Sequence, residues 1–129
     1  MKIIAATKNK NKLKEFAQIL PEFEIISPAD IGIDAEIEET GTTFEENSLI
    51  KAQAIYNMTG IAALADDSGL MVDALSGAPG VYSARYGTPD LDDKGRVRLL
   101  LENMKDVPKE KRGAKFVCVI TLVDGKRTI

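Results

Sequence analysis

The chain has 129 residues, a usual length for one domain, and its 44% hydrophobic and 29% charged residues exclude a disordered or collagen-like protein. Its formal net charge of −3 provides no generally basic surface, so binding to a nucleic-acid polymer is not expected. Because histidine is absent, a catalytic histidine and a histidine-ligated zinc ion are excluded, and hydrolytic chemistry would have to use carboxylates.

The first elements predict a β-α-β unit. Residues 3–6 form a short apolar run, typical of a buried strand. Asn9 is placed to cap a helix that ends before Pro21. A second strand is expected at residues 23–26, followed by an irregular connection over residues 27–37. This order is typical of an α/β sheet.

Residues 43–59 give the clearest helix pattern in the chain. Thr43 and Glu46 have the spacing of a capping box, and Gly60 follows the last turn. The apolar side chains that recur at helical spacing predict the buried stripe of this helix. Its members are Leu49, Ala52, Ile55 and Tyr56.

The middle of the chain alternates between strand, loop and helix. Residues 61–65 predict a third strand, interrupted by Asp66-Asp67-Ser68-Gly69 before residues 70–72 continue extended. Residues 76–89 contain three glycines and two prolines and predict a loop. A helix capped by Asp90 is expected next, running to about residue 104.

The longest strand is expected at residues 114–123, where the only cysteine, Cys118, is interpreted as a core residue. Asp124-Gly125 then predicts a hairpin turn, and only four residues remain to pair back. We therefore expect one domain that is incomplete at its C-terminus.

No apolar run approaches the roughly 18 to 20 residues of a membrane span, and the N-terminal run is too short for a secretory signal. A cytoplasmic protein without a membrane partner is expected.

The first segment suited to chemistry follows the first strand. At the start of a helix, unpaired backbone N–H groups and the positive end of the helix dipole favour a phosphate group, and three lysines lie there. A solvated basic first turn is the alternative interpretation, and the glycines of a Walker loop are missing. The segment consists of Thr7, Lys8, Asn9, Lys10, Asn11 and Lys12.

Two further segments are acidic. Glu36, Glu38 and Glu39 precede the helix, and Mg²⁺ commonly uses one or two carboxylates together with substrate phosphates. A solvated acidic loop would have the same sequence. Asp66 and Asp67 follow an apolar strand, where open α/β sheets place their ligands. One aspartate could bind a metal while it or its neighbour activates water, and an Asp-rich turn is the alternative.

Asn47 and Lys51 are four residues apart and therefore share one helix face. They could add an amide and an ammonium group to a phosphate pocket, or they could face solvent. Arg85, in a glycine-flanked loop, could reach a phosphate or a subunit contact. Groups that hold an anion beside groups that hold a cation suit metal-assisted attack of water on a nucleoside polyphosphate.

These segments resemble the inosine triphosphate pyrophosphatase family, also described as non-canonical purine NTP pyrophosphatases or XTP/dITP diphosphatases. The resemblance covers essentially the whole chain and rests on four motifs in family order. They are Thr7-x-Asn9-x-x-Lys12, Glu38-Glu39-Thr40-Gly41-Thr42-Thr43-Phe44-Glu45-Glu46-Asn47 with Lys51-Ala52, Ala65-Asp66-Asp67-Ser68-Gly69-Leu70, and Gly77-Ala78-Pro79-Gly80-Val81-Tyr82-Ser83-Ala84-Arg85-Tyr86.

The resemblance implies an α/β protein with a mixed sheet flanked by helices, the N-terminal portion of a two-lobed fold. It also implies a homodimeric, Mg²⁺-dependent hydrolase. Such an enzyme cuts ITP, dITP or XTP between the α and β phosphates, releases monophosphate and pyrophosphate, and so clears deaminated purines from the nucleotide pool.

Carried over residue by residue, the resemblance also implies roles for the site. The segment from Thr7 to Lys12 would hold the triphosphate, with Asn9 and Lys12 as the principal side chains. Lys51 would support the phosphates and Ser68 would touch the substrate. Asp67 would accept a proton from water and bind the metal. The further metal ligand would be Glu38, with Glu39 as the next choice.

The later portion of the family carries a Gly-rich Phe-Gly-Tyr-Asp segment, a lysine and a Ser-His-Arg segment that enclose the purine base, and this chain lacks them. The phosphate and metal half of the site is present without the base-reading half. Two alternatives follow: a catalytically impaired nucleotide-binding or dimerisation module, and an active relative with relaxed base choice.

Overall fold

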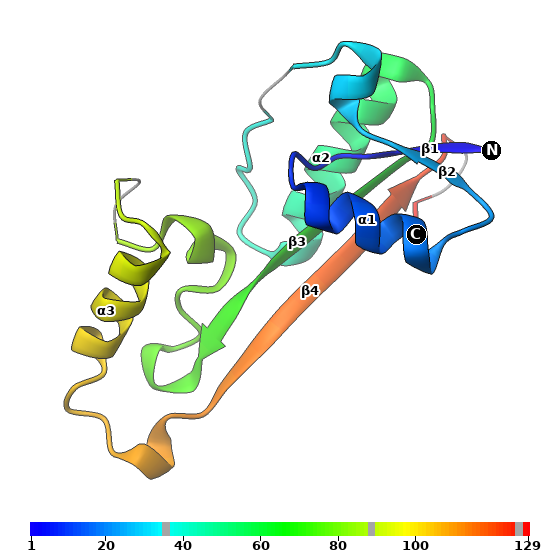
Figure 1. Ribbon diagram of the computed structural model, residues 1–129. Helices are drawn as coiled ribbons and strands as arrows, with labels where there is room; N and C mark the ends of the chain where they lie inside the picture. The colour runs from blue at the N-terminus through cyan, green and yellow to red at the C-terminus, as the bar shows by residue number, and fades with distance from the viewer. Residues whose placement is uncertain (35–36, 88–89, 126–127) are drawn as a thin grey trace. The chain divides into compact units, whose positions relative to one another are not determined.

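The computed structural model of the chain describes residues 1–34, 37–87, 90–125 and 128–129 (Figure 1). The chain divides into two compact units, Met1–Asp67 with Val119–Ile129, and Ser68–Cys118. The expectation of one domain, incomplete at its C-terminus, stays a prediction. Among the described residues, no helix combines the length and the apolar character needed to cross a membrane.

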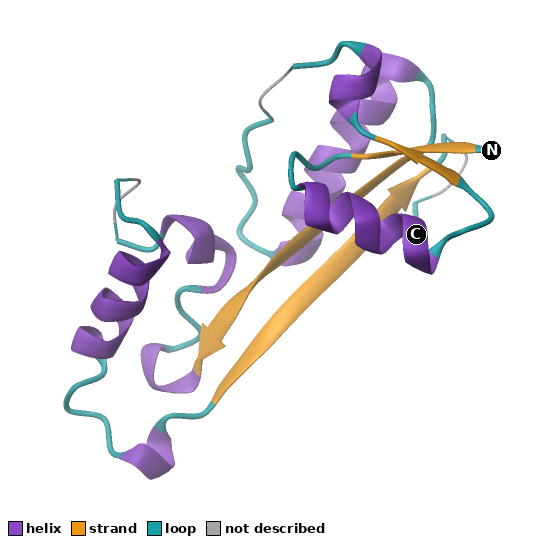
Figure 2. Cartoon of the chain, in the orientation of Figure 1, coloured by secondary structure: helices purple, strands orange, loops and turns teal. Residues whose placement is uncertain are grey.

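A four-stranded sheet organises the fold, with its strands in the order β2-β1-β3-β4 (Figure 2). The strands are β1 (Lys2–Ala5), β2 (Glu24–Ile26), β3 (Ala63–Val72) and β4 (Ala114–Val123). Strand β1 pairs in parallel with both β2 and β3, whereas the arrows of β3 and β4 run in opposite directions. The sheet is therefore mixed, as the family resemblance implies.

Helix α1 (Lys10–Ile19) joins β1 to β2 and completes the predicted β-α-β unit. Asn9 caps it as expected, because its side-chain oxygen accepts the N–H groups of Asn11 at 2.9 Å and Lys12 at 3.4 Å. The connection after β2 contains a short 3-10 helix, Pro28–Ile31, with a capping box between Ser27 and Asp30.

Helix α2 (Phe44–Thr59) begins and ends where the sequence predicts. The Thr43 hydroxyl accepts the N–H of Glu46 at 3.1 Å, and Gly60 closes the helix with a left-handed φ of 69°. The Glu46 carboxylate accepts the N–H of Thr42 at 2.8 Å. The first turn of α2 is thus tied to the loop that precedes it.

The predicted buried stripe of α2 is correct for Ala52 and Ile55 and wrong for Leu49, which is 38% exposed. The buried first turns carry polar Asn47 and Ser48 instead. The Ser48 hydroxyl forms a 2.6 Å hydrogen bond with that of Thr121 on β4, so burial leaves neither hydroxyl unsatisfied.

Replacing Thr43 by alanine is expected to destabilise the protein by about 1 kcal/mol, because the cap to the Glu46 N–H is lost. Urea unfolding followed by circular dichroism would measure this loss. The matched control is Thr40→Ala, in the same loop but outside the helix cap. Equal losses in the two variants would contradict the role of Thr43 as a cap.

The two faces of the sheet are covered by different helices (Figure 1). One buried cluster joins Leu64 of β3 and Ile3 of β1 to Phe16 of α1. The other joins Ala65 of β3 to Ala52 and Ile55 of α2. Because side chains alternate along a strand, Asp66 shares the α1 face with Leu64 and Asp67 shares the α2 face with Ala65.

The predicted interruption of β3 at Asp66-Asp67-Ser68-Gly69 is wrong, because β3 runs without a break from Ala63 to Val72. Strand β1 ends at Ala5, opposite Leu64, so β3 extends beyond its parallel neighbour. Strand β4 is the neighbour of β3 on its other side and is equally long. The two aspartates therefore lie in a strand, just beyond the carboxyl end of β1.

The second unit contains helix α3 (Asp93–Asn103), whose cap is Asp92 and not Asp90 as predicted. The Asp92 carboxylate accepts the N–H of Gly95 at 2.7 Å, whereas Asp90 is too far from the first turn to do so. The predicted loop before α3 contains a 3-10 helix, Gly80–Arg85, at the end of which the Arg85 guanidinium lies over the ring of Tyr82.

The last strand differs from the prediction in one respect. Cys118 is exposed, so its interpretation as a core residue is wrong. Strand β4 lies at an edge of the sheet, and only its last residues, such as Thr121 and Val123, are buried. The chain pairs back on β4 as predicted, since the backbones of Leu122 and Ile129 exchange two 2.8 Å hydrogen bonds. The predicted two-residue turn at Asp124-Gly125 is wrong, because Val123 pairs with Thr128.

Candidate active site

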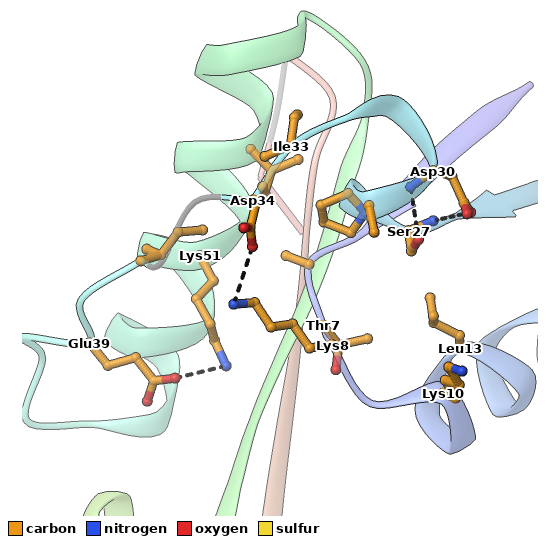
Figure 3. A pocket seen from close by; sticks show the side chains of 15 residues that line it. Thr7, Lys8, Lys10, Leu13, Ser27, Asp30, Ile33, Asp34, Glu39 and Lys51 are labelled. Carbon is orange, nitrogen blue, oxygen red and sulfur yellow. Dashed lines mark hydrogen bonds and ion pairs between the residues drawn. The ribbon is translucent and has the colours of Figure 1, made fainter.

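The first unit contains a pocket of about 620 Å³ at the carboxyl end of β1 (Figure 3). Four segments contribute its polar lining. They are the β1–α1 junction, the connection after β2, the loop that carries Glu38 and Glu39 before α2 (the acidic loop), and α2 itself. These polar residues are Thr7, Lys8, Lys10, Ser27, Asp30, Asp34, Glu39 and Lys51. The place is the one at which open α/β sheets bind their ligands, outside the carboxyl ends of the strands.

Lys51 of α2 links two of the segments that the sequence singles out. Its ammonium group lies 3.3 Å from the Glu39 carboxylate and donates a hydrogen bond to the backbone carbonyl of Asp66. The Lys51 side chain is only 16% exposed, so this contact is held away from bulk solvent. One cation thus brings the acidic loop to the aspartate-bearing strand.

The β1–α1 junction reaches the same strand through Lys12. Its ammonium group lies 2.8 Å from the carboxylate of Asp66, which is 8% exposed. Because Asp66 lies on the α1 face of the sheet, Lys12 contacts β3 from the side opposite α2. One lysine of the junction thus contacts one of the two aspartates, and the convergence of the junction with both aspartates on a single divalent ion stays a prediction.

Some of the predicted phosphate-binding residues line the pocket, and others make contacts within the fold. Thr7, Lys8 and Lys10 line the pocket, and Figure 3 shows Lys8 directed toward Asp34, at 3.9 Å. Asn9 instead caps α1, and Lys12 pairs with Asp66. Asn11 is exposed beside them. Phosphate binding by this segment stays a prediction.

Asp67 is buried on the α2 face, the face from which Lys51 approaches. Ser68, which would touch the substrate, is half-buried and begins the second unit. Asp67 is not among the residues that line the pocket, and its role as proton acceptor stays a prediction.

The three glutamates of the acidic loop have different surroundings. Glu39 is half-buried, lines the pocket and pairs with Lys51. Glu38 is exposed. Glu36, the first acid of the predicted cluster, lies outside the described residues. The geometry therefore separates Glu39 from Glu38, which the sequence alone leaves close in rank.

Among the described residues, no three histidine, cysteine, aspartate or glutamate side chains gather as a preformed metal cage. Mg²⁺ does not need one, because it keeps several waters and commonly takes one or two carboxylates with substrate phosphates. The half-buried Glu39 carboxylate and the buried Asp67 carboxylate are oxygen donors of the right kind for such an ion. These residues fit a cation that arrives with a polyphosphate.

The connection after β2 contributes residues that the sequence analysis did not assign to the site, namely Ser27, Asp30 and Asp34. Its position after the carboxyl end of a parallel strand was the available signal. The same connection supplies Ile33, and the acidic loop supplies Ile37, so part of the pocket lining is apolar. A lining with apolar and charged residues suits a ligand with an uncharged part beside its charged part.

Known proteins are similar to this chain in sequence and in fold. The Ham1 family matches residues 3–129. A dITP/XTP pyrophosphatase of Shigella flexneri is 49% identical, over 92% of this chain and 61% of that protein. One of Oceanobacillus iheyensis is 48% identical, over 98% and 66%. The structure of the Staphylococcus aureus Ham1 protein matches with a TM-score of 0.92 at 37% identity, over 100% of this chain and 67% of that one. This chain spans less than two thirds of either pyrophosphatase.

Proposed function

Because the chain belongs to the Ham1 family, we propose that it acts as a nucleoside triphosphate pyrophosphatase on dITP, ITP and XTP. The products are the monophosphate and pyrophosphate, and the role is to clear non-canonical purines from the nucleotide pool. The observation that carries the proposal is the contact of Lys51 with both Glu39 and the Asp66 carbonyl, beside a lysine-rich strand-to-helix junction.

The triphosphate is proposed to lie along the β1–α1 junction. Lys8 and Lys10 already line the pocket, and their flexible side chains can follow a chain of phosphates. Lys51 adds a third ammonium group from α2. The roles of Thr7, Asn9, Asn11 and Lys12 in this binding are carried over from the family resemblance, and a phosphate would compete with Asp66 for Lys12.

Asp67 is proposed to accept a proton from the water that attacks the α-phosphate. A bond forms between that water oxygen and the α-phosphorus, and the bond to the bridging oxygen of the β-phosphate breaks, so pyrophosphate leaves. Asp67 and Glu39 are proposed to hold Mg²⁺, with Glu39 in place of Glu38 because Glu39 lines the pocket. When bound, this ion would offset phosphate charge and polarise the reacting phosphoryl group.

Incubation of the purified chain with ITP, dITP, XTP and ATP in the presence of Mg²⁺, with measurement of released pyrophosphate, tests the function. Turnover that prefers ITP, dITP and XTP supports the proposal. Nucleotide binding without turnover would favour the binding module. Comparable rates on ATP and ITP would favour relaxed base choice.

Replacing Glu39 by glutamine is expected to lower kcat/KM for Mg²⁺-dependent pyrophosphate release by about 10-fold or more, because a carboxylate oxygen for the cation is lost. Glu38→Gln is expected to cause a smaller loss, since Glu38 is exposed. Glu45→Gln, an exposed change in the first turn of α2, is the control. A larger loss in Glu38→Gln would return the metal-ligand role to Glu38.

We also propose that the protein works in the cytoplasm as a homodimer, as the family resemblance implies. Light scattering coupled to size-exclusion chromatography measures the mass directly. A mass of twice 14.0 kDa is expected, and a monomer at micromolar concentration would contradict the proposal.

A further inference from the structure

Asn47 is fully buried in the first turn of α2, and its amide makes a specific contact with the acidic loop. Its Oδ1 atom accepts the backbone N–H of Gly41 at 2.8 Å. Because a backbone N–H requires an acceptor, this contact fixes which way the amide points. The Nδ2 group has no hydrogen-bond partner among the described residues, so the carbonyl side is the one that the fold uses.

Gly41 is pressed against the helix at this contact. A Cβ atom at position 41 would lie 2.7 Å from Asn47 Oδ1 and 2.6 Å from the Cβ atom of Glu46. Both distances are too short for a real side chain, so the loop backbone packs directly on the start of α2. The contact is a close one that only glycine permits.

The contact between Asn47 and Gly41 lies close to Glu39 along the chain. Gly41 lies two residues after Glu39, and Lys51 lies one helical turn after Asn47. The same face of α2 therefore holds the acidic loop twice, by its backbone at Gly41 and by its carboxylate at Glu39. Thr42 adds a further tie to Glu46, through its backbone N–H and its hydroxyl, and this tie is exposed.

We propose that Asn47 is a positioning residue that acts through Glu39. By holding the Gly41 N–H, it keeps the Glu39 carboxylate beside Lys51 and the Asp66 carbonyl. The kinetic consequence rests on the proposed function, whereas the contact itself does not. Asn47 is thus assigned to the support of the acidic loop, and not to direct contact with phosphate.

The test uses Asn47→Ala in the full chain. Hydrogen exchange of the Gly41 amide, followed by NMR, is expected to accelerate by about 10-fold, because the loss of one hydrogen bond corresponds to a factor of this order. The kcat/KM for pyrophosphate release is expected to fall by about 10- to 100-fold, as for a group misplaced by about 1 Å.

A double-mutant cycle separates positioning from a merely structural role. Asn47→Ala is expected to cost little further activity in a Glu39→Gln background, because its effect passes through that carboxylate. Asn57→Ala, at an exposed asparagine of the same helix, is the matched control and should leave both measurements unchanged. Equal losses in the two backgrounds would overturn the proposal.

The proposal can still be tested if the Asn47→Ala variant does not fold or if the chain releases no pyrophosphate. If Asn47→Ala does not fold, Gly41→Ala tests the same contact from the other side, since the new Cβ atom displaces the loop. If the unsubstituted chain releases no pyrophosphate, the proposed function fails, and Gly41 exchange still tests the contact. Unchanged Gly41 exchange in Asn47→Ala overturns the positioning role.

Discussion

The Asp67→Asn variant is expected to lose pyrophosphate release by about 10²- to 10⁴-fold, the range for removal of a positioned general base. Asparagine keeps the size of the side chain but cannot accept the proton of the attacking water. Its uncharged amide also binds a divalent cation more weakly than a carboxylate does. The release of pyrophosphate from ITP under single-turnover conditions would measure the loss at the chemical step.

Two matched variants serve as controls for Asp67→Asn. Asp66→Asn removes the neighbouring carboxylate, which faces α1 and pairs with Lys12, and a smaller loss is expected. Asp106→Asn, at an exposed site of the second unit, is expected to have no effect. Full activity of Asp67→Asn would refute Asp67 as the base, and a larger loss in Asp66→Asn would move that role to Asp66.

The Ile55→Ala variant is expected to lose about 2 to 5 kcal/mol of unfolding free energy, as is usual when a large buried side chain is truncated. Ile55 is 1% exposed and belongs to the cluster in which α2 packs against β1, β3 and β4. The side chains around it cannot fully close the space left behind. The urea unfolding midpoint, measured by circular dichroism, would report the loss.

Leu49→Ala is the matched control in the same helix. The apolar pattern alone gives Leu49 and Ile55 the same role, but Leu49 is 38% exposed. A loss well below that of Ile55→Ala is therefore expected, since surface substitutions usually change stability by only about 0.5 kcal/mol. Equal losses would show that Leu49 is buried in solution and would contradict the orientation of α2.

Local signals accounted for most of the elements in the first unit. The cap at Asn9, the cap at Thr43 and the glycine after Thr59 are contacts within a few residues, so the sequence carries them directly. The parallel pairing of β1 with β2 follows from the helix between them. These are the features that needed no knowledge of distant parts of the chain.

The errors arose where a distant contact decides the outcome. Ser48 is buried because Thr121, 73 residues later, satisfies its hydroxyl. The segment from Asp66 to Gly69 reads as a turn by composition, but it stays extended with β4 beside it. Cys118 occupies an apolar run and is exposed, since β4 lies at an edge of the sheet.

In the candidate site, too, the residue types could be predicted from the sequence, whereas the contacts between distant residues could not. Its lysines and acids were identified as residue types in sequence, and the structure brings Lys8, Lys10, Glu39 and Lys51 to one pocket. The pairing of Lys12 with Asp66, which spans 54 positions, could not be found from spacing. Neither could the choice of Glu39 over Glu38 as the partner of Lys51, because it depends on how the loop packs on α2.

The alternation of side chains along β3 gives its two adjacent aspartates separate environments, one against α1 and one against α2. Only odd or even position along the strand distinguishes them, so inserting or deleting one residue ahead of Asp66 would exchange their environments. After such a shift a different aspartate would face Lys12, and every later side chain of β3 would turn to the opposite face of the sheet. The length of the chain ahead of Asp66 therefore decides which carboxylate pairs with Lys12, although both residues are aspartates.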